Sequence, residues 1–293
     1  MEPFDDIRGL IGDLKPADAG AAAASLEQLG DAAGALGVLE PVVSWIAGWR
    51  GTAVLHRPVI ALYAGAHAGA GEVSATRAQL EAIAAGGAPV AQAAQHLGAG
   101  LDVFDLAIDR PVSDFRSGPT MSERECAATM AFGMEALAKQ PDLLILGAIG
   151  AGIEASAAAL IAALCDGAPS KDAVDRARSE AGADPLQLMR QLGGRETAAI
   201  GGAILAAANQ RTPVLLDGAS AIAAAAALHA VRPAAIAHCR VGQIGDPALT
   251  PVLTRLGLAP LFDLGVTLSD GTGSTAALSL IKLACALAPE VSK

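Results

Sequence analysis

The segment Ser269–Ser274, which reads Ser-Asp-Gly-Thr-Gly-Ser, carries the residue types best suited to chemistry. Its glycines allow the backbone to approach a ligand, and the helix expected after it would offer free N–H groups to an anion. We expect Asp270 to lie beside a bound group and to accept a proton. The structural alternative, in which Asp270 or Ser274 caps the helix from Thr275 onward, stays open. The ligand-binding residues expected in this loop are Gly271, Thr272 and Gly273.

A second glycine-rich segment, 147–152, follows the apolar run Leu143–Leu146 and reads Gly-Ala-Ile-Gly-Ala-Gly. Gly150 and Gly152 are candidate ligand-binding positions, because such loops can cradle a phosphate. Close packing of a helix against a strand would explain the same glycines, so both interpretations stay open.

Three further polar residues stand at element boundaries. Asp217 follows the apolar run 214–216, where it either points toward a ligand or caps the helix that begins near Ser220. Glu196 falls in the first turn of an expected helix, where the helix dipole is a sufficient explanation for a carboxylate. His67 lies in a glycine loop and is the one histidine that we weigh for function. No two histidines have metal-site spacing, so no metal is expected.

Apolar runs that alternate with small-residue loops and helices predict the elements that position these residues. The expected strands are Val59–Tyr63, Leu101–Ile108, Leu143–Leu146, Val214–Leu216, Ala234–His238 and Leu261–Leu268. This order predicts an α/β fold with a parallel sheet covered on both faces. Ligands bind such sheets beyond the carboxyl ends of the strands. We therefore expect the loops around Gly150, Asp217 and Gly271 to form a single hollow.

The first fifty residues show helical spacing of apolar side chains and form an expected small helical domain, 1–50, ahead of an α/β domain, 51–293. The most polar stretch, Asp166–Asp184, is expected to be an exposed excursion or a lid. Leu143–Cys165 has Glu154 as its only charge and could imitate a membrane span, but its glycines favour a strand, a loop and a helix.

Composition narrows the function classes. The 293 residues carry a net charge of −10, which argues against nucleic acid and anionic membrane surfaces as partners. The four cysteines form no CxxC pattern, so they are expected to be reduced thiols rather than zinc ligands. The start of the chain has no secretory signal pattern, and a cytoplasmic location is expected.

Short segments over nearly the whole chain match the motifs of one family in order. They are Phe4–Arg8, Gly34–Glu40, Ala64–Ala68, Val73–Ala75, Gly86–Ala88, Val103–Leu106, Cys126–Gly133, Asp184–Leu186, Gly193–Glu196, Pro213–Gly218, Gly257–Leu258, Pro260–Leu261, Asp263–Gly265 and Asp270–Gly273. In these segments the chain resembles the nicotinate-nucleotide–dimethylbenzimidazole phosphoribosyltransferase family of cobalamin synthesis. The resemblance implies a Rossmann-like domain with a small helical domain, assembled as a homodimer.

The resemblance also implies a reaction, the transfer of phosphoribose from nicotinate mononucleotide to 5,6-dimethylbenzimidazole. A carboxylate would take the benzimidazole proton while glycine loops and helix N-termini hold the phosphate. No metal or organic cofactor is expected. Ser74 matches a family serine, and Arg176 stands near the position of a family lysine, so both are expected to bind substrate.

The chain departs from the family pattern at its reactive positions. Asp270 replaces a glutamate, Ala148 replaces a second glutamate, and Glu154 falls within a family Asn-Thr-Thr segment. Two hypotheses follow. The chain is either a working transferase with Asp270 as base and Glu154 as a replacement carboxylate, or a catalytically silent paralogue that binds a ligand or a partner subunit.

Overall fold

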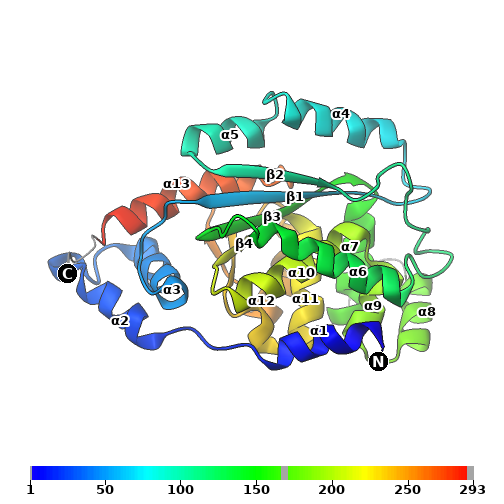
Figure 1. Cartoon of the computed structure of the whole chain (residues 1–293), viewed down its shortest axis with the longest axis horizontal. Coiled ribbons are helices and arrows are strands. Elements are labelled where there is room, and N and C mark those ends of the chain that lie inside the picture. Colours follow the sequence, from blue (N-terminus) through cyan, green and yellow to red (C-terminus); the bar gives the residue numbers. More distant parts are fainter. Residues whose placement is uncertain (1, 166–170, 289–293) are drawn as a thin grey trace.

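The computed structural model describes residues 2–165 and 171–288. Six parallel strands form one sheet in the order β2-β1-β3-β4-β5-β6 (Figure 1). The strands are β1 Pro58–Ala66, β2 Gly100–Asp105, β3 Leu143–Ala151, β4 Val214–Leu216, β5 Cys239–Gln243 and β6 Pro260–Phe262. Because all of them run in the same direction, their carboxyl ends meet at one edge.

Helices connect the strands. The α-helices are α1 Pro3–Gly12, α2 Ala19–Glu27, α3 Glu40–Arg50, α4 Val73–Ala84, α5 Pro89–Leu97, α6 Glu123–Gly133, α7 Ile153–Cys165, α8 Lys171–Ala181, α9 Pro185–Leu192, α10 Arg195–Asn209, α11 Gly218–Val231, α12 Thr250–Leu256 and α13 Thr272–Ala286. Short 3-10 helices cover Gly30–Ala32, Gly37–Leu39, Met134–Leu137, Pro233–Ile236 and Pro247–Leu249. Each later strand follows a helix, as a parallel sheet requires.

The sheet separates two hydrophobic cores. Successive strand residues point to opposite faces, so Ala61 and Tyr63 of β1 join the core built with α1, α6, α7 and α9–α12. Ile60 and Leu62 join the other core, built with α3, α5 and α13. In Figure 1, α4 and α5 lie above the sheet, while α6, α10 and α11 lie below it. The predicted α/β fold with a parallel sheet covered on both faces is confirmed.

Small residues allow unusually close helix packing on the first of these faces. A Cβ added to Gly202 of α10 would lie closer than 3.0 Å to the Met130 carbonyl of α6. A Cβ added to Gly133 of α6 would collide in the same way with Ala199 of α10. The alanine and glycine content therefore reflects backbone contact between helices, which larger side chains would prevent.

Five predicted strands differ from the structure. The strand predicted at Leu101–Ile108 ends at Asp105, and the one predicted at Val59–Tyr63 runs on to Ala66. The strand predicted at Ala234–His238 is wrong, because Pro233 begins a 3-10 helix and the strand starts only at Cys239. The strand predicted at Leu261–Leu268 ends at Phe262. The strand predicted at Leu143–Leu146 is longer, since β3 runs on through Gly147 and Gly150 to Ala151. None of the helices within 2–165 and 171–288 is long and apolar enough to cross a membrane.

The predicted helices of the first fifty residues are present. Phe4, Ile7 and Ile11 of α1 join one core of the sheet, whereas Val43 and Ile46 of α3 join the other. These residues therefore share both cores with the α/β unit, and the predicted boundary at residue 50 stays a prediction. The predicted polar excursion contains α8, and its residues 166–170 lie outside the described part of the chain.

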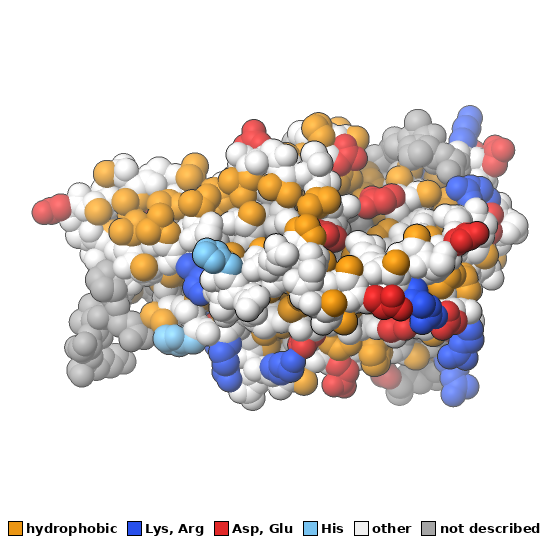
Figure 2. Space-filling view, turned by 90° about the horizontal axis from the view of Figure 1, so that it is seen from above, with side chains coloured by type: hydrophobic (Ala, Val, Ile, Leu, Met, Phe, Trp, Pro, Cys, Tyr) orange, Lys and Arg blue, Asp and Glu red, His pale blue; other side chains and the backbone are white. Residues whose placement is uncertain are grey.

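The face seen in Figure 2 carries acidic and basic side chains that are scattered among each other. On this face the basic side chains do not gather into one area of the kind that contacts a phosphate backbone. The exclusion of nucleic acid as a partner stays a prediction that rests on net charge.

Candidate functional site

A cavity of about 400 Å³ lies at the carboxyl-end edge of the sheet. Asp217 and Gly218 line it from the end of β4, Gln243 from the end of β5, and Ser269 from the segment after β6. Glu154 lines it from the first turn of α7. The cavity therefore lies where a parallel sheet places its ligands.

Asp217 is buried in this cavity wall, where its carboxylate binds the start of α13. Its Oδ1 accepts the Gly271 N–H at 3.1 Å and its Oδ2 accepts the Ser274 N–H at 2.7 Å. Burial raises the pKa of Asp217, and the negative charge of Asp270 adds to that rise, while the two amide bonds oppose it. The predicted cap of the helix near Ser220 is wrong, because the side chain makes no capping bond to α11. Asp217 both lines the cavity and joins β4 to α13.

The N-terminus of α13 is thus already occupied by carboxylates. Besides the two bonds to Asp217, the Thr272 N–H donates to Asp270 Oδ1 at 3.1 Å. An incoming phosphate would have to displace these acceptors to use the same N–H groups. Asp270 therefore accepts the first N–H of the helix, as the structural alternative proposed, but the helix begins at Thr272 rather than Thr275 and its N-cap residue is Gly271. It is partly exposed and lies next to the cavity-lining residue Ser269.

Glu154 links the α7 and β6 sides of the site. The Ser269 hydroxyl donates to Glu154 Oε1 at 3.0 Å. A neighbouring cavity of about 660 Å³ shares Glu154, Ala219, Asp246 and Leu249 with the first and is otherwise lined mainly by apolar side chains. Glu154 consequently stands at the junction of a polar and an apolar space, and the α7 dipole favours its charge there.

The glycines of the second loop serve close backbone contacts. Gly150 has φ +143°, and a Cβ there would collide with the Gly65 carbonyl of the neighbouring strand. Gly147 faces α13, where a Cβ would lie 3.3 Å from the Gly271 nitrogen. The loops around Gly147 and Gly271 are therefore adjacent. The predicted ligand-binding residues of these two loops do not line the cavity: Gly150, Gly152, Gly271, Thr272 and Gly273.

Ser74 and Arg176 lie apart from the cavity lining. The Ser74 hydroxyl donates to Glu72 at 3.0 Å on an exposed turn at the start of α4. The Arg176 guanidinium donates to the carbonyls of Phe115 at 2.6 Å and Arg116 at 2.9 Å, and so ties α8 to that loop. Their predicted role in substrate binding stays a prediction.

Two polar features of this edge were underestimated from the sequence. Gln243 forms two hydrogen bonds to the segment after β6: its Nε2 donates to the Val266 carbonyl at 2.6 Å, and its Oε1 accepts the Val266 N–H at 3.2 Å. Glu196, interpreted above only through the helix dipole, is fully buried and lies 3.1 Å from His67. The glycines that precede Glu196 and His67 in the sequence could have indicated this buried pair, because two large side chains in the interior need small neighbouring residues.

Within the described residues, no group of three or more His, Cys, Asp or Glu side chains could hold a metal ion. The described side chains therefore offer acid–base groups and polar contacts, and the absence of a metal from the reaction stays a prediction.

Comparison with known proteins decides the family. The sequence profile of a family described as "Phosphoribosyltransferase" matches residues 11–172 and 170–293. A protein of Allorhizobium ampelinum named nicotinate-nucleotide–dimethylbenzimidazole phosphoribosyltransferase is 42% identical over 97% of this chain and 93% of its own length. This chain belongs to that phosphoribosyltransferase family. A relative of the same name from Agrobacterium fabrum is also 42% identical, over 97% of this chain and 92% of its own length.

Solved structures of the phosphoribosyltransferase family share the fold. A nicotinate-nucleotide–dimethylbenzimidazole phosphoribosyltransferase of Thermus thermophilus superposes with a TM-score of 0.82 at 26% identity, covering 92% of this chain and 96% of that one. A second structure from the same organism gives a TM-score of 0.80 at 27% identity, covering 92% and 95% of the two chains. The parallel sheet is thus a feature that this chain has in common with its family.

Proposed function

We propose that this chain transfers phosphoribose from nicotinate mononucleotide to 5,6-dimethylbenzimidazole. The observation that carries the proposal is the cavity at the carboxyl-end edge, where Glu154 and Asp217 line the wall and Asp270 lies beside Ser269. The names of the relatives supply the substrates, and the carboxylates supply the acid–base group that the reaction needs.

In this reaction one benzimidazole nitrogen attacks C1′ of the ribose and forms the new N–C bond. The bond from C1′ to the pyridine nitrogen breaks, and its electron pair leaves with nicotinate. The proton on the other benzimidazole nitrogen passes to a carboxylate, for which we propose Asp270. Glu154 is the second proposed carboxylate, because it stands at the junction of the polar and apolar cavities. The apolar cavity suits a flat aromatic base.

The phosphate needs N–H donors that are not already bound. Asp217 and Asp270 occupy the start of α13, whereas Asp217 makes no capping bond to α11. Gly218 and Ala219, in the first turn of α11, line the polar cavity. We propose that this turn takes the phosphate.

The test is formation of α-ribazole phosphate by the purified protein from the two substrates, followed by chromatography. Asp270→Asn is the informative variant, because its amide oxygen can still accept the Thr272 N–H while the group can no longer take a proton. We expect turnover by the unaltered chain and a loss of at least about 100-fold in Asp270→Asn. Calorimetric binding of nicotinate mononucleotide without any turnover would instead identify a ligand-binding paralogue, and neither binding nor turnover would favour a partner subunit.

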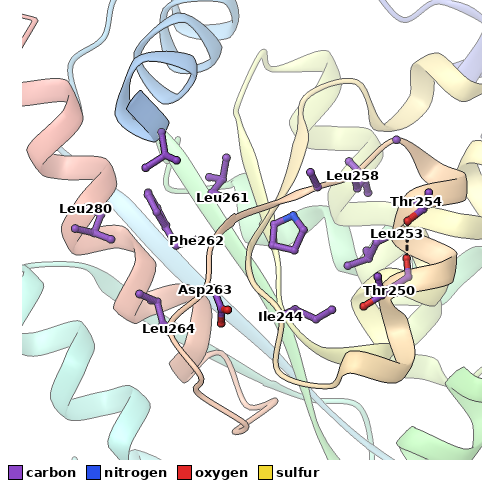
Figure 3. A pocket seen from close by; sticks show the side chains of 14 residues that line it. Ile244, Thr250, Leu253, Thr254, Leu258, Leu261, Phe262, Asp263, Leu264 and Leu280 are labelled. Carbon is purple, nitrogen blue, oxygen red and sulfur yellow. Dashed lines mark hydrogen bonds between the residues drawn. The ribbon is translucent and has the colours of Figure 1, made fainter. Parts of the chain in front are cut away.

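We also propose that the chain assembles as a homodimer, as the family resemblance implies. An apolar groove of about 890 Å³ borders the edge strand β6 (Figure 3). Leu261, Phe262, Leu264 and Leu280 line one side of it, and exposed Val38 contributes as well. Light scattering on a sizing column tests the proposal, and Leu264→Asp is expected to shift the mass toward the monomer if the groove is the interface.

A cytoplasmic location is proposed on the state of the cysteines. Burial raises the pKa of Cys126 to about 12 and that of Cys285 to about 12, so both thiols stay protonated. Such inert buried thiols suit a reducing compartment. Cell fractionation with an antibody to the native chain tests the location.

A further inference from the structure

A carboxylate–imidazole pair lies buried behind the candidate site. His67 follows β1 and Glu196 belongs to the first turn of α10, and His67 Nε2 lies 3.1 Å from Glu196 Oε1. Glu196 is 0% exposed and His67 is 3% exposed. Burial by itself would raise the pKa of Glu196, but the charge and hydrogen bond of His67 hold it below its ordinary value. The pair is therefore a hydrogen-bonded carboxylate and imidazole in the interior of the protein.

This arrangement is costly for the fold. Taking a carboxylate and an imidazole out of water carries a desolvation penalty, which is offset only when their polar atoms are satisfied. Among the residues that the structure describes, His67 Nδ1 and Glu196 Oε2 find no hydrogen-bond partner. Two glycines make room for the carboxylate, since a Cβ on Gly65 or on Gly194 would collide with Oε2. A well-packed hydrophobic pair would stabilise the chain at least as well, so stability alone does not account for this one.

His67 contacts the turn that joins β3 to α7. Its backbone N–H donates to the Ala151 carbonyl at 3.1 Å. A Cβ added to Gly152 would lie 2.9 Å from the His67 Cβ, so the His67 side chain packs against the Gly152 backbone. On the opposite side the Ala151 N–H donates to the buried Thr76 hydroxyl at 3.1 Å. The turn is therefore fixed between α4 and His67, and Glu196 fixes the ring of His67.

This turn sets the position of α7. The helix begins at Ile153, and the Ser156 N–H donates to the Gly152 carbonyl at 3.2 Å. Glu154 lies in this first turn and lines both cavities. An unbroken series of contacts thus leads from Glu196 through His67 and Gly152 to a carboxylate of the site.

We propose that His67 and Glu196 are positioning residues, which hold the first turn of α7, and with it Glu154, in the geometry that the reaction needs. This inference rests on the proposed function for its consequence in activity, but the positioning itself is a property of the fold. Neither residue reaches the cavity, so neither is proposed to touch a substrate.

Glu196→Gln is the direct test, because it keeps the shape of the side chain and removes its charge. Asp142→Asn is the matched control: Asp142 is also a buried carboxylate, but it accepts the N–H groups of His56 and Arg57 at the amino-end edge of the sheet. Both variants are expected to lower the melting temperature. Amide hydrogen exchange at residues 150–154 is expected to accelerate at least tenfold in Glu196→Gln and to stay unchanged in Asp142→Asn.

Activity gives the second measurement. We expect kcat/KM to fall at least tenfold in Glu196→Gln and less than twofold in Asp142→Asn. If Glu196→Gln does not fold, His67→Gln is the second variant, with the same expectations. Equal exchange at residues 150–154 in the variant and the control would overturn the inference. A chain without transferase activity would contradict the proposed function only, because the exchange measurement still decides the positioning role.

Discussion

The contact between α6 and α10 predicts that a glycine-to-alanine change lowers the stability of the protein at Gly202 but not at the adjacent Gly201. A methyl group at Gly202 would collide with the Met130 carbonyl, a backbone atom that cannot rotate away. At Gly201 the same methyl would meet only the mobile ends of Met189 at 3.4 Å and Met130 at 3.5 Å. Both glycines lie inside α10, so both substitutions gain the same helix propensity.

The magnitude follows from these two effects. Replacing glycine by alanine within a helix stabilises by about 0.5–1 kcal/mol. Overpacking costs about 1–3 kcal/mol and more where backbone must move, so we expect Gly202→Ala to lose about 3 kcal/mol net. For a chain of this length the entropy of unfolding is about 0.6 kcal/mol per degree, which converts the loss to a drop in melting temperature of about 5 °C. The melting temperature of Gly201→Ala should be unchanged or up to about 1 °C higher than that of the unaltered chain.

Calorimetry and urea unfolding on both variants provide the assay. If Gly202→Ala proved as stable as Gly201→Ala, the two helix backbones would not be in contact, and the account of the alanine-rich core would fail. Since α10 also carries Glu196, Gly202→Ala is expected to accelerate amide exchange at residues 150–154 as well.

Three further predictions follow from individual side chains. Burial lowers the pKa of His238 from its ordinary 6.5 to about 3. Stability should therefore be fully present above pH 6.5 and fall as the pH drops toward about 3, because protons bind the unfolded chain first. In urea titrations His238→Gln should reduce this fall. Glu154→Gln keeps an acceptor for Ser269 but removes a negative charge from the cavity, so calorimetry should show several-fold tighter binding of nicotinate mononucleotide, with a larger gain at low salt. Gln243→Ala should release the segment at Val266 and raise KM more than it lowers kcat.

Much of the fold was predictable because local patterns agree with it. The apolar runs at 59–63, 143–146 and 214–216 became three of the four interior strands, since a parallel sheet buried on both faces accommodates continuous apolar strands. The strand predicted at Ala234–His238 was wrong because apolar character does not distinguish a short helix from a strand, and Pro233 favoured the helix. The edge strand β6 was overestimated for a related reason, since its end depends on pairing with β5 rather than on its own composition.

The site was predictable in its location but less so in its contacts. The sequence indicated that the loops at the carboxyl ends of the strands would carry the site, and it singled out Asp217 and Glu154, which line the cavity there. It did not indicate that Asp217 would bind the start of α13, because the two are 54 residues apart and nothing local couples them.

By itself, then, the sequence determined the class of fold, the edge of the sheet that carries the site and the family to which the motifs belong. These depend on periodicity and residue order, which are local properties of the chain. Only the tertiary structure decided which N–H groups remain for an anion, which residues stand behind the cavity wall, and that Glu196 is a buried hydrogen-bond partner of His67. Those outcomes depend on burial and on contacts between distant segments, where the free energy of a charge is set by everything that folds around it.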